Sequence, residues 1–222
     1  MEKLNITIAI NPELYLKNPD LSDLGRRIIS NSIHLIDELG FEKFTFKKLS
    51  VRINSPESSI YRYFENKHQL LVYLTSWYWS WMYYRITMAV TNIESPKTRL
   101  INTIRILTTD VQEDLTISYV NEVQLNKIII TESVKAIHTK DVDKENEIGC
   151  FEAYKRVINK VAEILLEINS KFQYSHMLIT TVIEGSQQQH YYVSHLPSLT
   201  DGVENEDAIT KFYMEMIFKM IE

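Results

Sequence analysis

Residues 45–70, TFKKLSVRINSPESSIYRYFENKHQL, carry the pattern that decides the fold. Thr45 is a favourable helix N-cap, and the residues after it place their apolar side chains on one side of a short helix. Asn54 tolerates a positive φ better than most residues, so it can close the turn that follows. Ser55-Pro56 then signals a second helix, because Ser is a cap and Pro suits the first helical position. The segment predicts two short helices joined by a tight turn.

The stretch before this segment predicts a longer helix with both ends marked. Ser22 is an N-cap, and Gly40 stands where a left-handed C-cap is wanted. Between them the apolar residues recur at helical spacing. One longer helix followed by two short ones forms a helix-turn-helix unit. In that unit we expect Ile60 and Phe64 to face inward and Arg62 to face outward.

The rest of the chain favours long helices with few connections. Gly and Pro number 5 each among 222 residues, too few for the many tight turns of an all-β or doubly wound fold. The predicted fold class is all-α. Further helices are expected over about 67–88, 95–110, 118–138, 148–168, 174–195 and 204–221, with a charged, solvated connection at 140–147.

The N-terminus and the cysteine content bear on the compartment. Residues 1–20 alternate apolar and polar side chains and contain two prolines, which favours a short strand, an extended arm or a partly ordered tail. They show neither a basic leader nor a continuous apolar run, and no stretch of the chain is apolar enough to span a membrane. Cys150 is the single cysteine, so no internal disulfide can form. We expect a cytoplasmic protein.

The net charge of -5 is unevenly distributed along the chain. Residues 21–70 hold 8 basic and 6 acidic side chains and form the net-positive block, whereas residues 71–222 hold 14 basic and 20 acidic ones. This asymmetry indicates a small basic head on a larger acidic body.

Residues 26–74 resemble the DNA-binding region of the TetR family, the tetracycline-repressor-like bacterial regulators. The block Ile60-Tyr61-x-Tyr63-Phe64-x-Asn66-Lys67-x-x-Leu70 is similar to the family signature Leu-Tyr-x-Tyr/His-Phe-x-Ser-Lys-x-x-Leu. The segment departs from the family in its turn and at the two residues that follow: the usual turn Ala-Gly-Val-Ser is Ile53-Asn54-Ser55-Pro56 here, Glu57 stands where many members carry lysine, and Ser58 replaces the glycine after it. These departures affect which bases the protein would recognise rather than whether it would bind DNA.

The resemblance implies an N-terminal three-helix helix-turn-helix domain at 21–68, after an arm at 1–20, followed by a larger helical ligand-binding and dimerisation domain at 69–222. It also implies a transcription regulator, by default a repressor, that binds a palindromic operator in double-stranded DNA as a homodimer. A small hydrophobic or aromatic effector would release it by favouring a different spacing of the two recognition helices.

A recognition helix presents its N-terminal residues to base edges in the major groove. Base contacts are therefore predicted for Glu57, Ser58, Ser59 and Arg62, with Arg62 suited to guanine and Glu57 to the cytosine amino group. Phosphate contacts are predicted for Thr45, Lys47, Lys48, Tyr61, Tyr63 and Lys67. Simpler interpretations stay open: surface tyrosines, a solvated lysine face, and for Glu57 an acid that stabilises the helix N-terminus.

The C-terminal body offers two further predictions, each with a plainer alternative. A pocket for a flat or cationic molecule is predicted from aromatic residues that could equally be core packing: Trp77, Trp81, Tyr84, Tyr119 and Tyr154. An intersubunit four-helix bundle, as the resemblance implies, is predicted from apolar residues that could equally be intramolecular core: Leu178, Val182, Gly185, Val193, Met214, Ile217, Phe218 and Ile221.

An enzyme is not expected. The sequence has no Walker loop, nucleophile elbow or zinc-ligand spacing, and its one Glu-x-x-His spacing, Glu65 to His68, falls inside the helix-turn-helix signature. We therefore predict no cofactor, no metal and no catalytic residues. The alternative function is a helical protein-interaction module that has lost DNA binding, which Glu57 and the overall acidity make conceivable.

Overall fold

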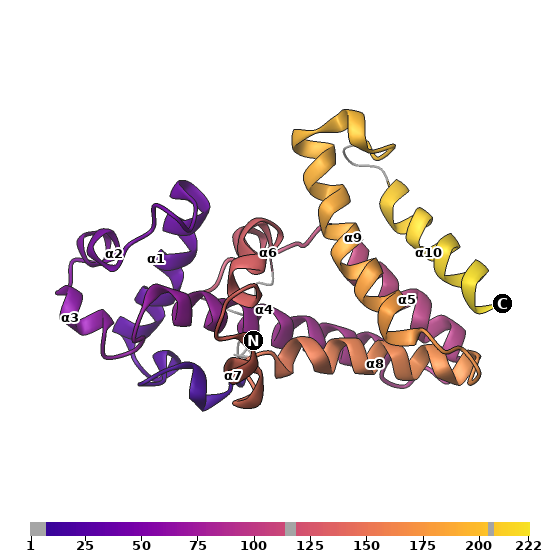
Figure 1. Cartoon of the computed structure of the whole chain (residues 1–222), viewed down its shortest axis with the longest axis horizontal. Helices are drawn as coiled ribbons and strands as arrows, with labels where there is room; N and C mark the ends of the chain where they lie inside the picture. The colour runs from indigo at the N-terminus through magenta and orange to yellow at the C-terminus, as the bar shows by residue number, and fades with distance from the viewer. Residues whose placement is uncertain (1–7, 114–118, 204–206) are drawn as a thin grey trace, which may run out of the picture. The chain divides into compact units, whose positions relative to one another are not determined.

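The computed structural model describes residues 8–113, 119–203 and 207–222, and within them the chain is all-α with no strand. Figure 1 shows the order of the elements along the chain. The α-helices are α1 (Asp23–Leu39), α2 (Phe46–Arg52), α3 (Glu57–Ile60), α4 (Lys67–Val90), α5 (Pro96–Thr108), α6 (Glu122–Ile137), α7 (Val142–Glu147), α8 (Glu152–Ile168), α9 (Ser175–His195) and α10 (Ala208–Ile221). Short 3-10 helices are η1 (Pro12–Leu14), η2 (Pro19–Leu21) and η3 (Pro197–Leu199).

The described residues divide into two compact units. The first consists of residues 1–80 and 111–153, and so holds α1–α3, the first part of α4, α6 and α7. The second consists of residues 81–110 and 154–222, with the end of α4, α5, nearly all of α8, α9 and α10. The domain boundaries predicted at 20/21 and 68/69 follow a different criterion and stay a prediction.

In the first unit, the end signals of α1 and α2 are confirmed. Ser22 Oγ accepts a hydrogen bond from the amide of Gly25 at 3.0 Å, and Gly40 ends α1 with φ 76°. Thr45 Oγ1 accepts from the amide of Lys48 at 3.2 Å and so caps α2. Asn54 closes the next turn with φ 47°.

The core of the first unit lies beneath these caps. The inward side chains of α1–α4 and their connections that are at most 2 % exposed include Ile28, Ile29, Ile33, Ile36, Leu49, Ile53, Ile60, Phe64 and Leu70. Gly25 is required where η2 crosses α1, because a Cβ there would lie 2.2 Å from the carbonyl oxygen of Pro19. The apolar periodicity of the sequence thus produces a small bundle around a common core.

The second unit is a set of packed helices in which α5, α9 and α10 contact one another. Val182, Ile183 and Ile217 are at most 1 % exposed. Thr108 Oγ1 donates to Thr210 Oγ1 at 3.0 Å, which joins α5 to α10. No helix in the described part of the chain is long and apolar enough to cross a membrane.

Three expectations for local structure need correction or fall outside the described residues. The charged run expected as a solvated connection contains a helix, α7, whose six residues are not buried. The N-terminal arm folds into η1 and η2, with Ile8 and Leu14 buried, whereas the alternating residues Leu4 and Ile6 lie outside the described part. The helix expected from residue 118 begins at Glu122, where Asn121 caps it.

Candidate nucleic-acid interface

Helix α3 is the element expected to carry base contacts, and it is shorter than the Ser55 start signal suggests. Pro56 is its N-cap and only Glu57–Ile60 is α-helical. The turn continues because the amide of Phe64 donates to the carbonyl of Ile60 at 3.2 Å. In the preceding turn the amide of Ser55 donates to Ser50 O at 3.0 Å, which fixes the step from α2 to α3.

The two flanks of this segment differ in exposure. Ile60 and Phe64 are completely buried, while Ser58, Tyr61 and Arg62 are exposed. The ring of Tyr61 packs edge-on against Phe46 with a centroid distance of 5.1 Å, so its hydroxyl extends from a fixed ring. A buried apolar flank therefore holds a polar flank out to solvent.

Lys47 on α2 and Arg62 after α3 are exposed, and their side chains form neither an ion pair nor a hydrogen bond with the described residues. Nearby cations differ. Arg52 pairs with Glu38 at 2.8 Å, and the ammonium of Lys48 donates to the carbonyl of Lys43 at 2.7 Å. The side chains of Lys47 and Arg62 are thus available to bind an external anion.

The remaining predicted base-contacting residues, Glu57 and Ser59, are half-buried at the start and middle of α3. Glu57 Oε1 lies 3.5 Å from the hydroxyl of Tyr61. As an acid in the first turn, Glu57 also meets the positive end of the helix backbone. Thr45 is exposed at the start of α2, where its hydroxyl already serves as the cap.

Tyr63 does not suit its predicted phosphate contact. Its side chain is only 2 % exposed, and its hydroxyl forms a 2.7 Å hydrogen bond with Ser22 Oγ, the cap of α1. Lys17 lies over the Tyr63 ring, 5.2 Å from its centroid. The tyrosine therefore joins the segment after α3 to the start of α1.

Lys67 also has an internal role. Its ammonium donates to the carbonyl oxygens of Phe41, Glu42 and Phe44 at 3.1, 3.3 and 3.4 Å. It lies 4.7 Å from the centroid of the Phe41 ring. These contacts hold the corner between α1 and α2, so the ammonium faces backbone acceptors rather than an external phosphate.

Sequence reasoning missed Glu132 of α6, which supports the same corner. Its carboxylate accepts the amide of Phe41 at 3.1 Å and pairs with Lys135 at 2.7 Å. Lys135 also pairs with Glu42 at 3.1 Å, and its hydrogen bonds to Glu132 and Glu42 raise the pKa of the ammonium despite some desolvation. The partners are 91 residues apart, so no local pattern signals this contact.

Arg27 was likewise not singled out by its sequence position. Its guanidinium donates to the carbonyl of Ile53, the C-cap residue of α2, and lies 3.5 Å from the Asp23 carboxylate. The contact fixes the end of α2 against α1. A basic residue on the polar face of α1 is the only sequence signal for it.

The residues predicted to line an effector pocket fall into both units. Trp77 and Tyr119 belong to the first unit, in which the hydroxyl of Tyr119 donates to the carboxylate of Asp20. Burial and this carboxylate raise the pKa of Tyr119 above its usual range. Trp81, Tyr84 and Tyr154 belong to the second unit, where Tyr154 donates to Glu184 at 2.7 Å. The pocket stays a prediction.

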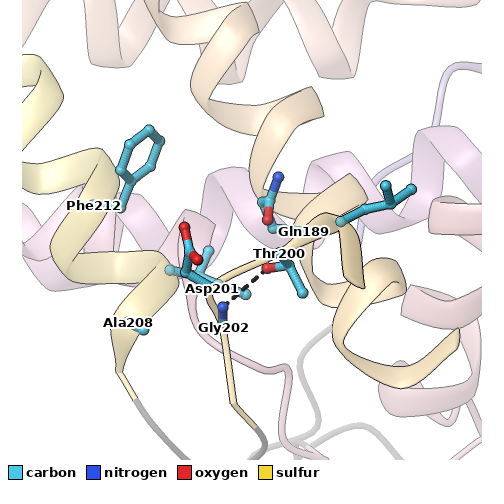
Figure 2. Close-up of a pocket in the computed structure, with 8 residues that line it drawn as sticks. Gln189, Thr200, Asp201, Gly202, Ala208 and Phe212 are labelled. Carbon is cyan, nitrogen blue, oxygen red and sulfur yellow. Dashed lines mark hydrogen bonds between the residues drawn. The ribbon is translucent and has the colours of Figure 1, made fainter. Parts of the chain in front are cut away.

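A hollow of about 180 Å³ lies elsewhere in the second unit, beside α9 and α10. Figure 2 shows Gln189, Thr200, Asp201, Gly202, Ala208 and Phe212 around it, with the amide of Gly202 donating to Thr200 Oγ1 at 3.0 Å. None of the predicted pocket residues lines it. A metal site is not formed in the described part of the chain by any three His, Cys, Asp or Glu residues.

Half of the predicted dimer residues are already buried within the single chain: Leu178, Val182, Ile217 and Ile221. Gly185 packs beneath Tyr213, because a Cβ there would lie 2.2 Å from the hydroxyl oxygen. These five positions follow the alternative of intramolecular core. Val193, Met214 and Phe218 are partly exposed, and the outward apolar residues include two that the sequence pattern missed, Phe212 and Met220.

Comparison with protein families finds a match in the N-terminal part of the chain. Residues 28–74 match the family model described as bacterial regulatory proteins, tetR family. No curated protein sequence matches the chain.

Solved structures resemble the chain over most of its length. One is a regulatory protein in the tetR family from Rhodococcus RHA1 (13 % identity, 90 % of this chain and 97 % of that chain, TM-score 0.60). Another is AibR in complex with isovaleryl coenzyme A and operator DNA (15 % identity, 87 % and 98 %, TM-score 0.58). A third is the superantigen PfiT (11 % identity, 93 % and 99 %, TM-score 0.59). At such identities the likeness shows the fold.

Proposed function

We propose that this chain, whose residues 28–74 match the family model described as bacterial regulatory proteins, tetR family, is a cytoplasmic, sequence-specific DNA-binding regulator that acts as a homodimer on a palindromic site. The observation that carries the proposal is the segment after Pro56. Its inner residues Ile60 and Phe64 are buried, while Ser58 and Arg62 stand outward and exposed. An element of this kind, held by a rigid bundle, suits the major groove.

Base readout falls to the outward residues of this segment. Arg62 has an exposed guanidinium whose fork matches the O6 and N7 acceptors of guanine. Ser58 and Ser59 provide hydroxyls for either donors or acceptors, and Glu57 accepts from the amino group of cytosine. We assign sequence preference chiefly to Arg62, since a bidentate contact discriminates most strongly.

Phosphate contacts fall to residues that flank the recognition segment. Lys47 and Tyr61 are exposed, and Lys48 and Thr45 lie beside them at the start of α2. Tyr63 and Lys67 are left out of this set because their polar atoms are engaged with Ser22 and with backbone carbonyls. They act as positioning residues within the helix-turn-helix unit.

Regulation is proposed as repression relieved by a small hydrophobic or aromatic effector. A protein of the same fold, AibR, is described in complex with both an acyl coenzyme A and operator DNA, which supports a ligand-responsive body. The aromatic residues proposed to contact an effector are Trp77 and Tyr119 in the first unit and Trp81, Tyr84 and Tyr154 in the second. The effector would shift the dimer between two states by no more than its difference in affinity for them.

Dimerisation is proposed through the exposed side of α9 and α10. Phe212 is 59 % and Met220 49 % exposed, and Met214 and Phe218 are half-buried on the same helix. Apolar side chains of this size on an outer helix face gain from burial against a second copy. The two recognition segments would then reach successive major grooves about 34–36 Å apart.

The second candidate, a protein-interaction module, is favoured by one comparison. PfiT has the same fold and is described as a superantigen, so the fold alone does not imply DNA binding. The acidic net charge of -5 would also suit such a role.

Selection of genomic DNA fragments by the purified full-length protein separates these candidates. The proposal predicts recovery of a palindromic site. A plot of the logarithm of the binding constant against the logarithm of the salt concentration should have a slope of about -7, as expected for about eight phosphate contacts. Failure to retain duplex DNA, or a binding signal insensitive to salt, would favour the interaction module.

A further inference from the structure

The segment that leads into α1, residues 16–22, is fastened to the end of the recognition segment. The amide of Leu16 donates to the carbonyl oxygen of Tyr63 at 2.8 Å. Further along, Ser22 Oγ forms a 2.7 Å hydrogen bond with the hydroxyl of Tyr63. The segment therefore contacts Tyr63 both at its backbone and at the end of its side chain. Tyr63 directly follows Arg62, the residue to which we assign base readout.

The same segment has a defined conformation of its own. Asn18 Oδ1 accepts a hydrogen bond from the amide of Asp20 at 2.9 Å, which begins η2. Pro19 is buried where η2 crosses α1 at Gly25. Nε of Arg26 donates to the carbonyl oxygen of Asp20 at 3.0 Å. A side chain carried by this segment starts from a fixed backbone, so it loses less conformational freedom on binding than one on a loose tail.

Lys17 is the cation that this segment holds beside Tyr63. Its ammonium group lies over the Tyr63 ring, 5.2 Å from the centroid. The side chain is exposed and forms neither an ion pair nor a hydrogen bond with the described residues. A contact with the face of a ring uses none of the N–H donors of an ammonium group. These donors therefore remain available to an external acceptor.

Two acidic side chains that follow Lys17 in the chain contact other partners. The carboxylate of Asp20 accepts a hydrogen bond from the hydroxyl of Tyr119. The carboxylate of Asp23 lies 3.5 Å from the guanidinium of Arg27. Neither acid pairs with the ammonium group of Lys17, so its positive charge is open to solvent.

The position of Lys17 also bears on the phosphate contact that the sequence predicts for Tyr63. The tyrosine hydroxyl is bonded to Ser22, and one face of its ring is covered by Lys17. The ammonium group thus offers a charged donor beside a hydroxyl that is already engaged. Hydrogen bonds from a cation to a phosphate oxygen are about twice as strong as neutral ones.

We propose that Lys17 contacts a backbone phosphate of DNA next to the bases that Arg62 reads, so that residues 16–22 form part of the DNA interface. This inference rests on the proposed DNA-binding function and adds one cationic contact in each subunit. A phosphate contact carries no sequence information. Lys17 therefore adds affinity for every duplex and leaves the choice of site to Arg62.

The test is the salt dependence of DNA affinity for the full-length Lys17→Met variant, measured on the duplex recovered by genomic selection. Met keeps an unbranched side chain beside the Tyr63 ring and removes the charge. Because each subunit of the proposed dimer loses one phosphate contact, the plot of log affinity against log salt should become shallower by about two. At about 0.1 M salt the affinity should fall by at least about tenfold. A duplex of unrelated sequence should also be bound more weakly.

Two further variants serve as controls. Lys17→Arg keeps the positive charge and should keep the salt dependence of the native protein. Lys127→Met removes the same charge from an exposed position on α6, which Figure 1 shows apart from α3 within the first unit. This variant should leave both the affinity and its salt dependence unchanged.

The inference is overturned if Lys17→Met keeps the native salt dependence, even at lower affinity. A residue that merely positions the segment would lower affinity without changing the number of phosphates neutralised. It is also overturned if Lys127→Met flattens the plot equally, since the effect then reflects net charge alone. A native protein that retains no duplex overturns the proposed function together with this inference, whereas native binding with an unchanged slope for Lys17→Met overturns this inference alone.

Discussion

The helix-turn-helix segment and the α9–α10 pair are both built from amphipathic helices, yet they use their outer faces differently. In the first, a polar flank with Arg62 covers the buried Ile60 and Phe64. In the second, apolar residues stand on both sides: Ile217 is buried, whereas Phe212 is 59 % exposed. An apolar stripe therefore predicts which side chains become buried, but not whether they pack against their own chain or against a second molecule.

The largest expected effect is a difference in stability between alanine variants of two phenylalanines, one from each region. Phe64→Ala should lower the free energy of unfolding by about 3–5 kcal/mol, because it leaves a cavity beneath the recognition segment. Phe212→Ala should change it by no more than about 0.5 kcal/mol in the monomer, as its ring is mostly in water. Urea denaturation followed by circular dichroism measures both. Equal losses at the two positions would show that the regions are not built as described.

Two glycines sharpen the same contrast. Gly25→Ala should destabilise by about 1–3 kcal/mol, since its Cβ would meet the backbone of Pro19, which cannot turn aside. Gly185→Ala should cost less, because the atom it meets is the hydroxyl of Tyr213 at the end of a side chain. Adding Tyr213→Phe should recover part of the Gly185→Ala loss and none of the Gly25→Ala loss. A full-sized loss at Gly185 that Tyr213→Phe leaves unchanged would contradict this packing.

Lys67 and Lys47 form the next pair. Lys67→Met should lower the free energy of unfolding by about 1–2 kcal/mol, because its ammonium serves three carbonyl acceptors at the α1–α2 corner. Lys47→Met, at an exposed position, should leave stability nearly unchanged. Thermal unfolding of the two variants decides the point, and an unaffected Lys67 variant would return this residue to the phosphate-contacting set.

The smallest expected effect is a pH dependence in the second unit. Burial alone would lower the pKa of His190, but its hydrogen bonds to Asp110 and to the carbonyl of Thr108, at 3.1 and 2.8 Å, raise it overall. The stabilisation that His190 provides is complete below its pKa in the unfolded chain, near 6.5, and is lost as pH rises through its higher pKa in the folded chain. The His190→Gln variant should therefore have a lower free energy of unfolding than the native chain below pH 6.5, and nearly the same free energy of unfolding at high pH. A constant difference across this window, measured by urea midpoints, would disprove the coupling.

Local signals made the helix-turn-helix unit predictable from sequence. Ser22, Gly40, Thr45 and Asn54 each act within four residues of their own position, so their types and spacing are sufficient. The short helix α7 escaped prediction because its charged residues give no apolar periodicity.

Long-range contacts set the limit of what the sequence could tell. Tyr63 is a plausible phosphate ligand by type, but its hydroxyl bonds Ser22, 41 residues earlier. Lys67 likewise meets carbonyls 23 to 26 residues away. Leu178 and Val182 show a stripe that suits either a partner or the chain's own core, and only the packing of α9 against α5 and α10 distinguishes the two.

The central claim is that the outward flank of α3 reads bases, and Arg62→Ala tests it most directly. The measurement is affinity for a set of duplexes that carry each single base-pair change in the recovered site. We predict that Arg62→Ala loses about 1–3 kcal/mol of discrimination at one position in each half-site and keeps the remaining preferences, whereas Lys47→Ala weakens binding to all duplexes alike. If Arg62→Ala instead weakens every duplex equally, or changes nothing, this flank does not read the sequence of DNA.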